Sequence, residues 1–248
     1  MGELIAVLSG KGGTGKTSVC AAVSTALARL GHSVLAIDCD MGLQNLDISL
    51  GLSDSGAISF LDVSEGGYRL EQAAVHHLFP ALSFLTAPIN RTAESVDEDA
   101  FRDMVRSAKR KFDYIFLDAP AGIDAGFSLA AKFADRCLIV TGADPAAMRD
   151  AARAAQRLEL MGKTEVQLIV NRVSRKLFST MSVTVDDVMD TAGLPLIGVV
   201  PEDQNVTLAA AFGAPLITHT NRGAAKACEA IAKRLEGRRV PLSIFDIF

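Results

Sequence analysis

The chain has 248 residues, of which 49% are hydrophobic and 22% are charged, so it is long enough to bury a sizeable core and its composition excludes a disordered protein. Its 25 Lys and Arg residues against 29 Asp and Glu residues give a net charge of −4, which argues against a surface coated with basic residues for nucleic acid. No apolar run approaches the roughly 20 residues of a membrane-spanning helix, and the scattered cysteines predict neither a disulfide framework nor a metal site. We therefore expect a cytoplasmic globular protein.

Short apolar runs alternate with helical patterns along the chain. The runs are apolar on both faces, which is typical of a parallel sheet covered by helices on each side. Strands are predicted at residues 4–9, 33–38, 82–87, 114–118, 136–141, 167–171, 196–200 and 215–218. Helices are predicted at residues 16–30, 96–111, 146–161, 185–192 and 223–236. This alternation predicts a doubly wound α/β fold with a mostly parallel sheet flanked by helices.

No linker, repeat or low-complexity tract interrupts the chain, so we expect one domain at residues 1–236 and a tail at residues 237–248. Residues 53–79 have no clear periodicity and are expected to hold short helices. Within them, His76 and His77 have no acidic partner at ligand spacing and are expected on the surface of a helix or loop.

The first predicted strand leads into a complete phosphate-binding loop. Gly10-Lys11-Gly12-Gly13-Thr14-Gly15-Lys16-Thr17 matches G-x-x-x-x-G-K-[ST] and opens a helix, as the motif requires. Its glycines allow successive N–H groups to converge on phosphate oxygens at the helix N-terminus. Lys16 is expected to neutralise the β- and γ-phosphates, and the Thr17 hydroxyl to bind Mg²⁺. The alternative is a glycine-rich turn before an ordinary helix.

Two carboxylates follow the second predicted strand, at the sheet edge where open α/β folds bind ligands. Strand alternation places Asp38 and Asp40 on one side and Cys39 on the other, so Cys39 is expected to be a small buried apolar residue. Paired carboxylates beside a nucleotide hold the water ligands of Mg²⁺ or orient the attacking water. For Asp38, a loop-capping role is the alternative.

A further carboxylate, Asp118, ends the apolar strand at residues 114–118 in the manner of a Walker B motif, which holds Mg²⁺ through water. A strand that ends in Asp commonly just begins a turn, so this assignment depends on the phosphate loop upstream. Two later strands are followed by further candidate residues on the same sheet edge, all polar except the proline: Asn171, Arg172, Pro201, Glu202 and Asp203. An Asn at the end of a strand is otherwise most often a turn residue.

The second lysine of the phosphate loop, Lys11, stands directly after the first glycine, which a plain P-loop does not need. The loop therefore resembles KGGxGK[ST], the signature of the deviant Walker A family of MinD/ParA ATPases. The resemblance implies that Lys11 reaches across a homodimer, formed around ATP, to the phosphates bound by the other subunit. Spacing alone leaves open a solvated lysine.

Further segments at residues 42–47, 118–123 and 195–204 match the MinD branch of that family, and the match runs over residues 5–234. The resemblance implies a slow, partner-stimulated ATP hydrolase whose catalytic residues are Lys11, Lys16 and Asp40, with Asp40 positioning the attacking water. It assigns Gly122 to the γ-phosphate and Asn171 and Arg172 to the adenine. It also assigns Pro201 to Asp203 to the base pocket, and Asp38 and Asp118 to the metal beside Thr17. Asp150 is expected to pair with the other subunit's Lys11, a first-turn helix acid being the alternative.

The C-terminal tail combines basic and apolar residues. Four basic residues precede five large apolar ones: Lys233, Arg234, Arg238 and Arg239, then Leu242, Ile244, Phe245, Ile247 and Phe248. This pattern suits a weak anchor in an anionic membrane surface. However, Asp246 stands where the resemblance implies a basic residue, and the alternative is a tail that packs on its own domain or on a neighbouring chain.

The combined prediction is a MinD-like ATPase that dimerises with ATP and Mg²⁺ and binds the inner surface of the cell membrane. The resemblance implies that it helps to position the division septum and that ATP hydrolysis releases it. The resemblance implies MinC-like and MinE-like partners, and nucleic acid is not expected. The alternatives are a ParA-type positioning ATPase that acts on DNA and a flagellar-placement ATPase with a different protein partner. The acidic net charge disfavours the first, and the sequence does not separate the second.

Overall fold

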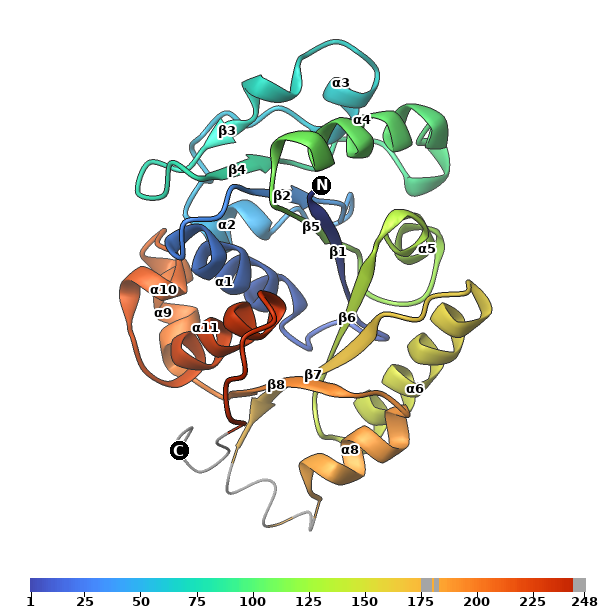
Figure 1. Cartoon of the computed structure of the whole chain (residues 1–248), viewed down its shortest axis with the longest axis vertical. Coiled ribbons are helices and arrows are strands. Elements are labelled where there is room, and N and C mark those ends of the chain that lie inside the picture. The colour runs from blue at the N-terminus through green and yellow to red at the C-terminus, as the bar shows by residue number, and fades with distance from the viewer. Residues whose placement is uncertain (175–179, 181–182, 243–248) are drawn as a thin grey trace.

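The computed structural model describes residues 1–174, 180 and 183–242 (Figure 1). Its strands are β1 (Glu3–Leu8), β2 (Val34–Asp38), β3 (Ala74–Val75), β4 (Leu82–Leu85), β5 (Tyr114–Asp118), β6 (Arg136–Thr141), β7 (Val166–Val173) and β8 (Leu196–Pro201). Its α-helices are α1 (Lys16–Arg29), α2 (Leu46–Leu50), α3 (Phe60–Ser64), α4 (Glu98–Lys111), α5 (Ala125–Phe133), α6 (Pro145–Leu160), α8 (Val185–Ala192), α9 (Gln204–Ala211), α10 (Leu216–His219) and α11 (Gly223–Leu235). Short 3₁₀ turns occupy η1 (Leu70–Gln72) and η2 (Ala93–Ser95).

The strands form one eight-stranded sheet in the order β3-β4-β2-β5-β1-β6-β7-β8. All neighbours are parallel except β3, which runs antiparallel to β4 at one edge. Helices cover both faces: α1, α2, α9, α10 and α11 on one, and α4, α5, α6 and α8 on the other (Figure 1). The predicted doubly wound α/β fold is therefore confirmed.

Each face of the sheet has its own apolar core, and β1 contributes to both. Leu4, Ala6 and Leu8 pack toward α4, α5 and α6, whereas Ile5 and Val7 pack toward α1 and α11. Because every second side chain of a strand points to the same face, a strand between two helical layers is apolar throughout. This burial explains why β1 and its neighbours are recognisable as continuous apolar runs.

The strand order sets the position of the functional residues. β5 lies between β2 and β1, and Asp118 is in register with Asp38 on one side and Val7 on the other. The phosphate loop begins at Gly10, two residues after the last residue of β1. Three segments far apart in the sequence thus meet at the carboxyl edge of the central strands, where open parallel sheets bind ligands.

The predicted strand at residues 215–218 is wrong, because these residues belong to helix α10. Pro215 is the N-cap with φ −61°, and Leu216 and Ile217 are buried in the core beside α1 instead of adding a strand beyond β8. A short apolar run does not by itself distinguish a buried strand from one turn of a buried helix, which is why the pattern misled. Helices α2 and α5 were also missed.

Residues 53–79 hold the expected short helices, α3 and η1, and also the edge strand β3. The predicted surface position of His76 is wrong. His76 is fully buried, its Nδ1 accepts the Leu78 N–H (3.0 Å) and its Nε2 bonds the Leu50 carbonyl (2.9 Å). It is a core residue that joins the end of α2 to the turn after β3, whereas His77 is exposed as expected. In the described part of the chain, no helix combines the length and apolar character needed to cross a membrane.

Candidate functional site

The phosphate loop joins β1 to α1, and two of its glycines have backbone conformations that other residues adopt at a cost. Gly13 has φ +78° and Gly15 has φ +82°, both in the left-handed region. Gly15 is the N-cap of α1 and supplies no side-chain cap, so the first amides of the helix are available to an anion. The loop has the geometry that the motif predicts.

Neighbouring elements approach this loop so closely that two glycines have no room for a side chain. A Cβ on Gly10 would lie 2.2 Å from the carbonyl oxygen of Asp150 on α6, and one on Gly15 would lie 2.3 Å from Nδ2 of Asn171. Asn171 donates from Nδ2 to the Thr14 carbonyl (2.7 Å), and Arg172 donates to the Gly13 carbonyl (3.2 Å). The loop is therefore held from both sides by distant parts of the chain.

Lys16 and Asp118 form a buried ion pair with 2.6 Å between Nζ and Oδ1 and side chains only 6% and 1% exposed. Burial lowers the pKa of Lys16, but the Asp118 carboxylate outweighs it and leaves the pKa above its ordinary value. Burial likewise raises the pKa of Asp118, and Lys16 opposes that rise. Nζ of Lys16 also lies 3.4 Å from the Thr17 hydroxyl. The structure thus brings together the lysine, carboxylate and hydroxyl that the sequence assigned to phosphate and metal.

Three buried polar atoms, on the residue after β1, in the phosphate loop and on Asp118 itself, have no hydrogen-bond partner among the described residues: Ser9 Oγ, Thr14 Oγ1 and Asp118 Oδ2. Buried polar atoms in native proteins are nearly always satisfied, so a group of three points to a polar ligand, ion or water. No cluster of three or more His, Cys, Asp or Glu residues that could hold a metal exists in the described ranges. Mg²⁺ needs no such cluster beside a nucleotide, because phosphate oxygens and waters complete its six ligands. The hydroxyl of Thr17 and the free oxygen of Asp118 fit that arrangement.

Asp38 is buried and both of its carboxylate oxygens accept backbone N–H groups, from Asp40 (2.8 Å) and Leu46 (3.1 Å). This is the loop-capping role that the sequence left as the alternative to metal binding. Burial and the nearby Asp118 charge raise the pKa of Asp38 to about 7, although the two N–H groups oppose the rise. Asp40 accepts the N–H groups of Gly42 (3.1 Å) and Leu43 (3.2 Å) through Oδ1 and so stabilises its own turn. Cys39 is buried, as predicted.

Lys11 lies in a more open environment than Lys16. Its Nζ is 2.9 Å from Oδ1 of Asp144, and the two side chains are 34% and 47% exposed. Asp144 is also the N-cap of α6 and accepts the N–H of Ala147 (3.0 Å). Asp150, which the sequence paired with Lys11 of another subunit, lies 3.5 Å from Arg153 in this single chain. Sequence reasoning missed Asp144, although its place before a helix-opening proline marks it as an N-cap.

Gly122 has φ +99°, and its N–H donates to the carbonyl of Ser9 (3.0 Å). The segment after β5 is therefore joined to the strand end from which the phosphate loop departs. A γ-phosphate that accepted this N–H would have to displace the Ser9 carbonyl. The assignment of Gly122 to the γ-phosphate stays a prediction.

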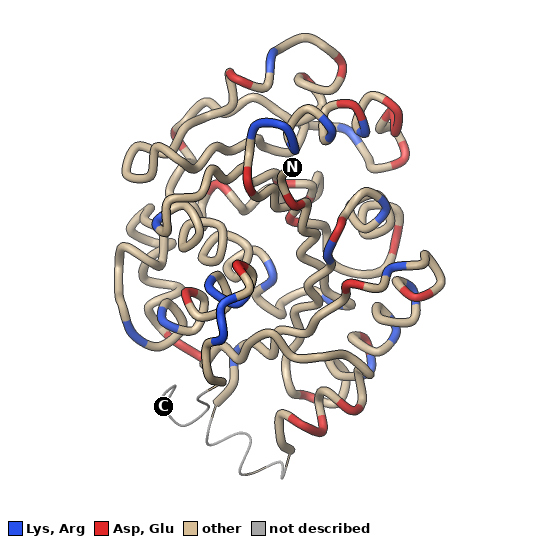
Figure 2. Tube along the Cα trace, viewed as in Figure 1, with Lys and Arg blue, Asp and Glu red and all other residues tan. Residues whose placement is uncertain are grey.

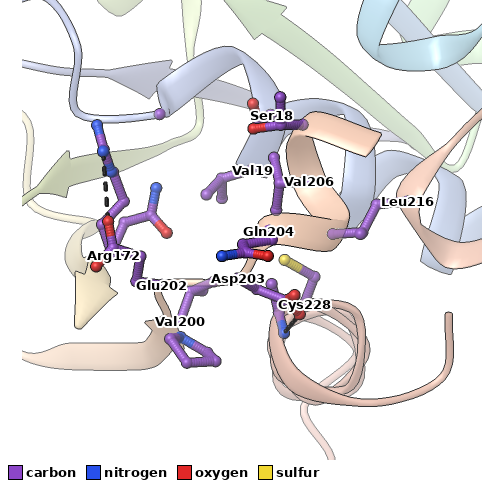
Figure 3. Close-up of a pocket in the computed structure, with 15 residues that line it drawn as sticks. Ser18, Val19, Arg172, Val200, Glu202, Asp203, Gln204, Val206, Leu216 and Cys228 are labelled. Carbon is purple, nitrogen blue, oxygen red and sulfur yellow. Dashed lines mark hydrogen bonds and ion pairs between the residues drawn. The ribbon is translucent and has the colours of Figure 1, made fainter. Parts of the chain in front are cut away.

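A cavity of about 720 Å³ opens beside the phosphate loop, between α1 and the ends of β7 and β8 (Figure 3). The five strand-end residues predicted from the sequence all line it, four of them polar: Asn171, Arg172, Pro201, Glu202 and Asp203. The sequence missed its apolar wall, which comes from helices: Val19, Val206, Leu216, Ala224 and Cys228. Its size lies within the range of about 300–1,000 Å³ common for small-molecule sites, and it combines an apolar floor with a polar rim, as a purine base requires.

Asp203 lines this cavity, but its carboxylate is directed at the backbone. Oδ1 accepts the N–H of Asn205 (2.9 Å) and caps α9, while Oδ2 accepts the N–H of Ala224 (3.0 Å) at the start of α11. Asp203 thus joins two helices that form one wall of the cavity. Glu202 lies 3.5 Å from the Arg172 guanidinium across the rim (Figure 3).

Comparisons with known proteins agree with this geometry. The family model of the CobQ/CobB/MinD/ParA nucleotide binding domain matches residues 5–216. The septum site-determining protein MinD of Synechocystis is 38% identical over 248 residues, covering 99% of this chain and 93% of that protein. A chain of the MinC:MinD cell division protein complex from Aquifex aeolicus superposes with a TM-score of 0.89 at 35% identity, covering 97% of this chain and 98% of that chain. MinD of Pyrococcus horikoshii, solved with Mg-ADP, superposes with a TM-score of 0.83 at 29% identity, covering 95% and 96%.

Proposed function

The chain belongs to the CobQ/CobB/MinD/ParA family of nucleotide-binding proteins, and from this premise we propose that it is a MinD-type ATPase that helps to position the division septum. The observation that carries the proposal is the phosphate loop beside the buried Lys16–Asp118 pair, together with buried polar atoms of Ser9, Thr14 and Asp118 that have no hydrogen-bond partner in the described part of the chain. The resemblance to a MinD solved with Mg-ADP supports ATP and Mg²⁺ as its ligands.

Phosphate binding needs a rearrangement of the Lys16–Asp118 pair. Lys16 turns from Oδ1 of Asp118 to the β- and γ-phosphates, while the amides of the loop and of the α1 N-terminus bind the remaining oxygens. Thr17 and Asp118 are the residues that would hold Mg²⁺, which supplies positive charge against the phosphate oxygens when bound. The adenine enters the cavity between α1 and β8.

Hydrolysis depends on positioning more than on a strong base, as is general for phosphoryl transfer. Asp40 orients the attacking water once its turn opens, because Oδ1 is held by the N–H groups of Gly42 and Leu43. Lys11 leaves Asp144 and neutralises phosphate charge across a homodimer. Gly122 follows the γ-phosphate by exchanging the Ser9 carbonyl for a phosphate oxygen. These rearrangements make hydrolysis slow until a partner favours them.

The proposal places the ATPase in residues 1–236 and a peripheral membrane contact in the tail. Figure 2 shows basic residues gathered where α11 passes into the tail. Arg234 is not available to lipid, because its guanidinium donates to the carbonyls of Ile197 (2.9 Å), Val240 (3.1 Å) and Pro241 (2.9 Å). Arg238 bonds Glu236 (2.9 Å), which leaves Lys233 and Arg239 as the candidates for anionic headgroups. Leu242 is exposed, and the rest of the proposed anchor, residues 243–248, lies outside the described residues.

A MinC-like protein is the proposed partner, since one of the similar structures is a MinC:MinD complex. The family resemblance adds a MinE-like activator. The segments on which hydrolysis depends expose two apolar side chains, Leu43 and Ile123, and a partner or a second copy that covers them would influence both segments at once.

The proposal is tested by measuring Mg²⁺-dependent ATP hydrolysis, the mass of the protein in ATP and ADP, and co-sedimentation with anionic liposomes. The full chain and a chain that stops at Val240 are compared. We expect ATP to give a dimer that pellets with liposomes, and truncation to abolish pelleting but not dimerisation. No binding of either nucleotide would refute the ATPase. A dimer that never pellets would refute the membrane contact alone and favour a DNA-borne or protein-borne positioning ATPase.

A further inference from the structure

The end of β7 departs from regular strand geometry at the two residues that contact the phosphate loop. Pairing between β7 and β8 shifts register between Val170 and Val173, and Arg172 has φ +58°. In a regular strand, adjacent side chains such as Asn171 and Arg172 point to opposite faces of the sheet. The irregularity instead lets both side chains bond carbonyls of the same loop, Asn171 that of Thr14 and Arg172 that of Gly13.

A left-handed backbone is unfavourable for an arginine, by about 1 kcal/mol or more, and such conformations persist where surrounding contacts maintain them. Arg172 has two such contacts, to the Gly13 carbonyl (3.2 Å) and to Glu202 (3.5 Å). Glu202 is itself held in place, because its N–H donates to the Val173 carbonyl (3.0 Å). The strained residue thus connects the end of β8 to the phosphate loop.

Peptide planarity gives these contacts a consequence for the loop's amides. In a trans peptide unit the carbonyl and the N–H of the next residue point in opposite directions. When the carbonyls of Gly13 and Thr14 are fixed toward Arg172 and Asn171, the N–H groups of Thr14 and Gly15 are fixed away from them. Neither of these N–H groups makes a hydrogen bond within the part of the chain that the structure describes, so both are free to bind an anion.

We propose that Asn171 and Arg172 form a clamp that pre-orients the Thr14 and Gly15 amides toward phosphate, and that both are positioning residues for the phosphates of any nucleotide. The inference rests on the proposed function in taking the loop's ligand to be a polyphosphate. It differs from the adenine-reading role that the family resemblance assigns to Asn171. One Nδ2 hydrogen of Asn171 is already used by the Thr14 carbonyl, and the Arg172 guanidinium is directed at the loop.

The two roles differ in what they do to ligands without adenine. A clamp strengthens the binding of Mg-ATP, Mg-GTP and Mg-tripolyphosphate by the same factor, because all three present phosphates to the same amides. A residue that recognises adenine strengthens the binding of Mg-ATP alone. Dissociation constants for these three probes, measured by titration calorimetry on the full chain, therefore separate them.

The variants are Asn171→Ala, Arg172→Ala, Arg172→Gly and Arg172→Lys. Loss of the buried Asn171 hydrogen bond is expected to weaken the binding of all three probes about tenfold. Loss of the more exposed Arg172 hydrogen bond is expected to weaken their binding about threefold. Arg172→Gly accepts φ +58° without strain, so it removes the guanidinium while keeping the backbone, and it tests the clamp even if Asn171→Ala does not fold. Arg172→Lys keeps the charge and is expected to recover part of the affinity.

The matched control is Arg106→Ala on α4, whose side chain is 57% exposed and pairs with Asp103, against 60% exposure for Arg172. We expect Arg106→Ala to leave all three dissociation constants unchanged. We also expect the thermal unfolding midpoint of Arg172→Gly to equal that of Arg106→Ala. An unchanged tripolyphosphate affinity with a lost preference for ATP over GTP would overturn the clamp and leave the ATPase proposal intact. Failure of the unaltered chain to bind any probe would overturn the proposed function and the clamp with it.

Discussion

The two lysines of the phosphate loop stand five residues apart in the sequence and have opposite environments. Lys16 is 6% exposed and faces a carboxylate that is 1% exposed, whereas Lys11 is 34% exposed and faces one that is 47% exposed. A buried pair is costly to separate unless another charge replaces the lost partner, while an exposed pair contributes little and separates readily. The contrast agrees with two proposed functions for one residue type in one loop: Lys16 would be released from its carboxylate only by an anion, and Lys11 would move toward a second subunit.

The strongest test of this contrast replaces each lysine by alanine. Lys16→Ala leaves Asp118 buried without its partner, so we expect nucleotide binding to be lost and the free energy of unfolding to fall by about 3 kcal/mol. Lys11→Ala removes only an exposed pair, so it is expected to keep wild-type stability and ATP binding but to remain monomeric with ATP. Urea unfolding, calorimetry and light scattering measure the three properties. A Lys11→Ala chain that dimerises normally would refute the role across the dimer.

A second test uses pH, because burial and the Asp118 charge raise the pKa of Asp38 from 3.8 to about 7. Between these values the folded chain keeps a proton that the unfolded chain has released. The contribution of Asp38 therefore lowers the free energy of unfolding as pH rises from about 4 to about 7, by at most about 1.4 kcal/mol per pH unit, and levels off above. Asp38→Asn removes the titration.

The observable is the difference in the free energy of unfolding between wild type and Asp38→Asn at pH 5, 6, 7 and 8, without nucleotide. Taking the difference cancels the titration of other groups, such as Asp113, whose pKa is lowered by its bonds to Ser33. We expect wild type to lose stability relative to the variant between pH 5 and 7. Parallel curves would show that Asp38 is charged throughout and that its two backbone hydrogen bonds outweigh its burial.

The more completely buried part of the site is also the part that sequence reasoning predicted best. Asp38 and Asp118 end strands β2 and β5, which are buried over all or nearly all of their length. The apolar runs of such strands are visible without any knowledge of pairing, and in a parallel sheet the ends of neighbouring strands meet at one edge. Lys16 and Thr17 belong to one contiguous motif. Local sequence pattern and strand topology were therefore enough to predict that these residues lie close together.

What the sequence did not predict depends on packing between distant segments. The Lys11–Asp144 pair joins residues 133 positions apart and depends on how α6 begins beside the phosphate loop. The burial of His76 depends on a carbonyl 26 residues away. Helix α5 is apolar over most of its surface, so it lacks the periodicity that identifies an amphipathic helix, and Gly126 in it packs against Pro120 where a Cβ would not fit.

The smallest expected effect is that of substituting Asp144. This substitution tests whether Lys11 is restrained within its own subunit. Asp144→Asn removes the charge but keeps a side chain that caps α6, because asparagine accepts the Ala147 N–H as well as aspartate does. The helix is therefore expected to stay intact while Lys11 loses its partner. Since both side chains are more than a third exposed, each pair is worth about 0.2–1 kcal/mol. A homodimer releases two such pairs, so their loss is expected to tighten ATP-dependent dimerisation between about twofold and about thirtyfold.

Asp150→Asn is the matched control for Asp144, because it removes the same charge from the same helix and, within one subunit, lies beside Arg153 instead of Lys11. Sedimentation velocity with ATP gives the dimer dissociation constants of both variants. If Asp144 restrains Lys11, Asp144→Asn dimerises more tightly than wild type and Asp150→Asn does not. If Asp150 receives Lys11 from the other subunit, Asp150→Asn dimerises more weakly. If the two substitutions change the dimer dissociation constant in opposite directions, Lys11 leaves Asp144 of its own subunit and pairs with Asp150 of the other as the dimer forms. If both change it equally, the effect is one of general charge at this surface and neither carboxylate has a specific role.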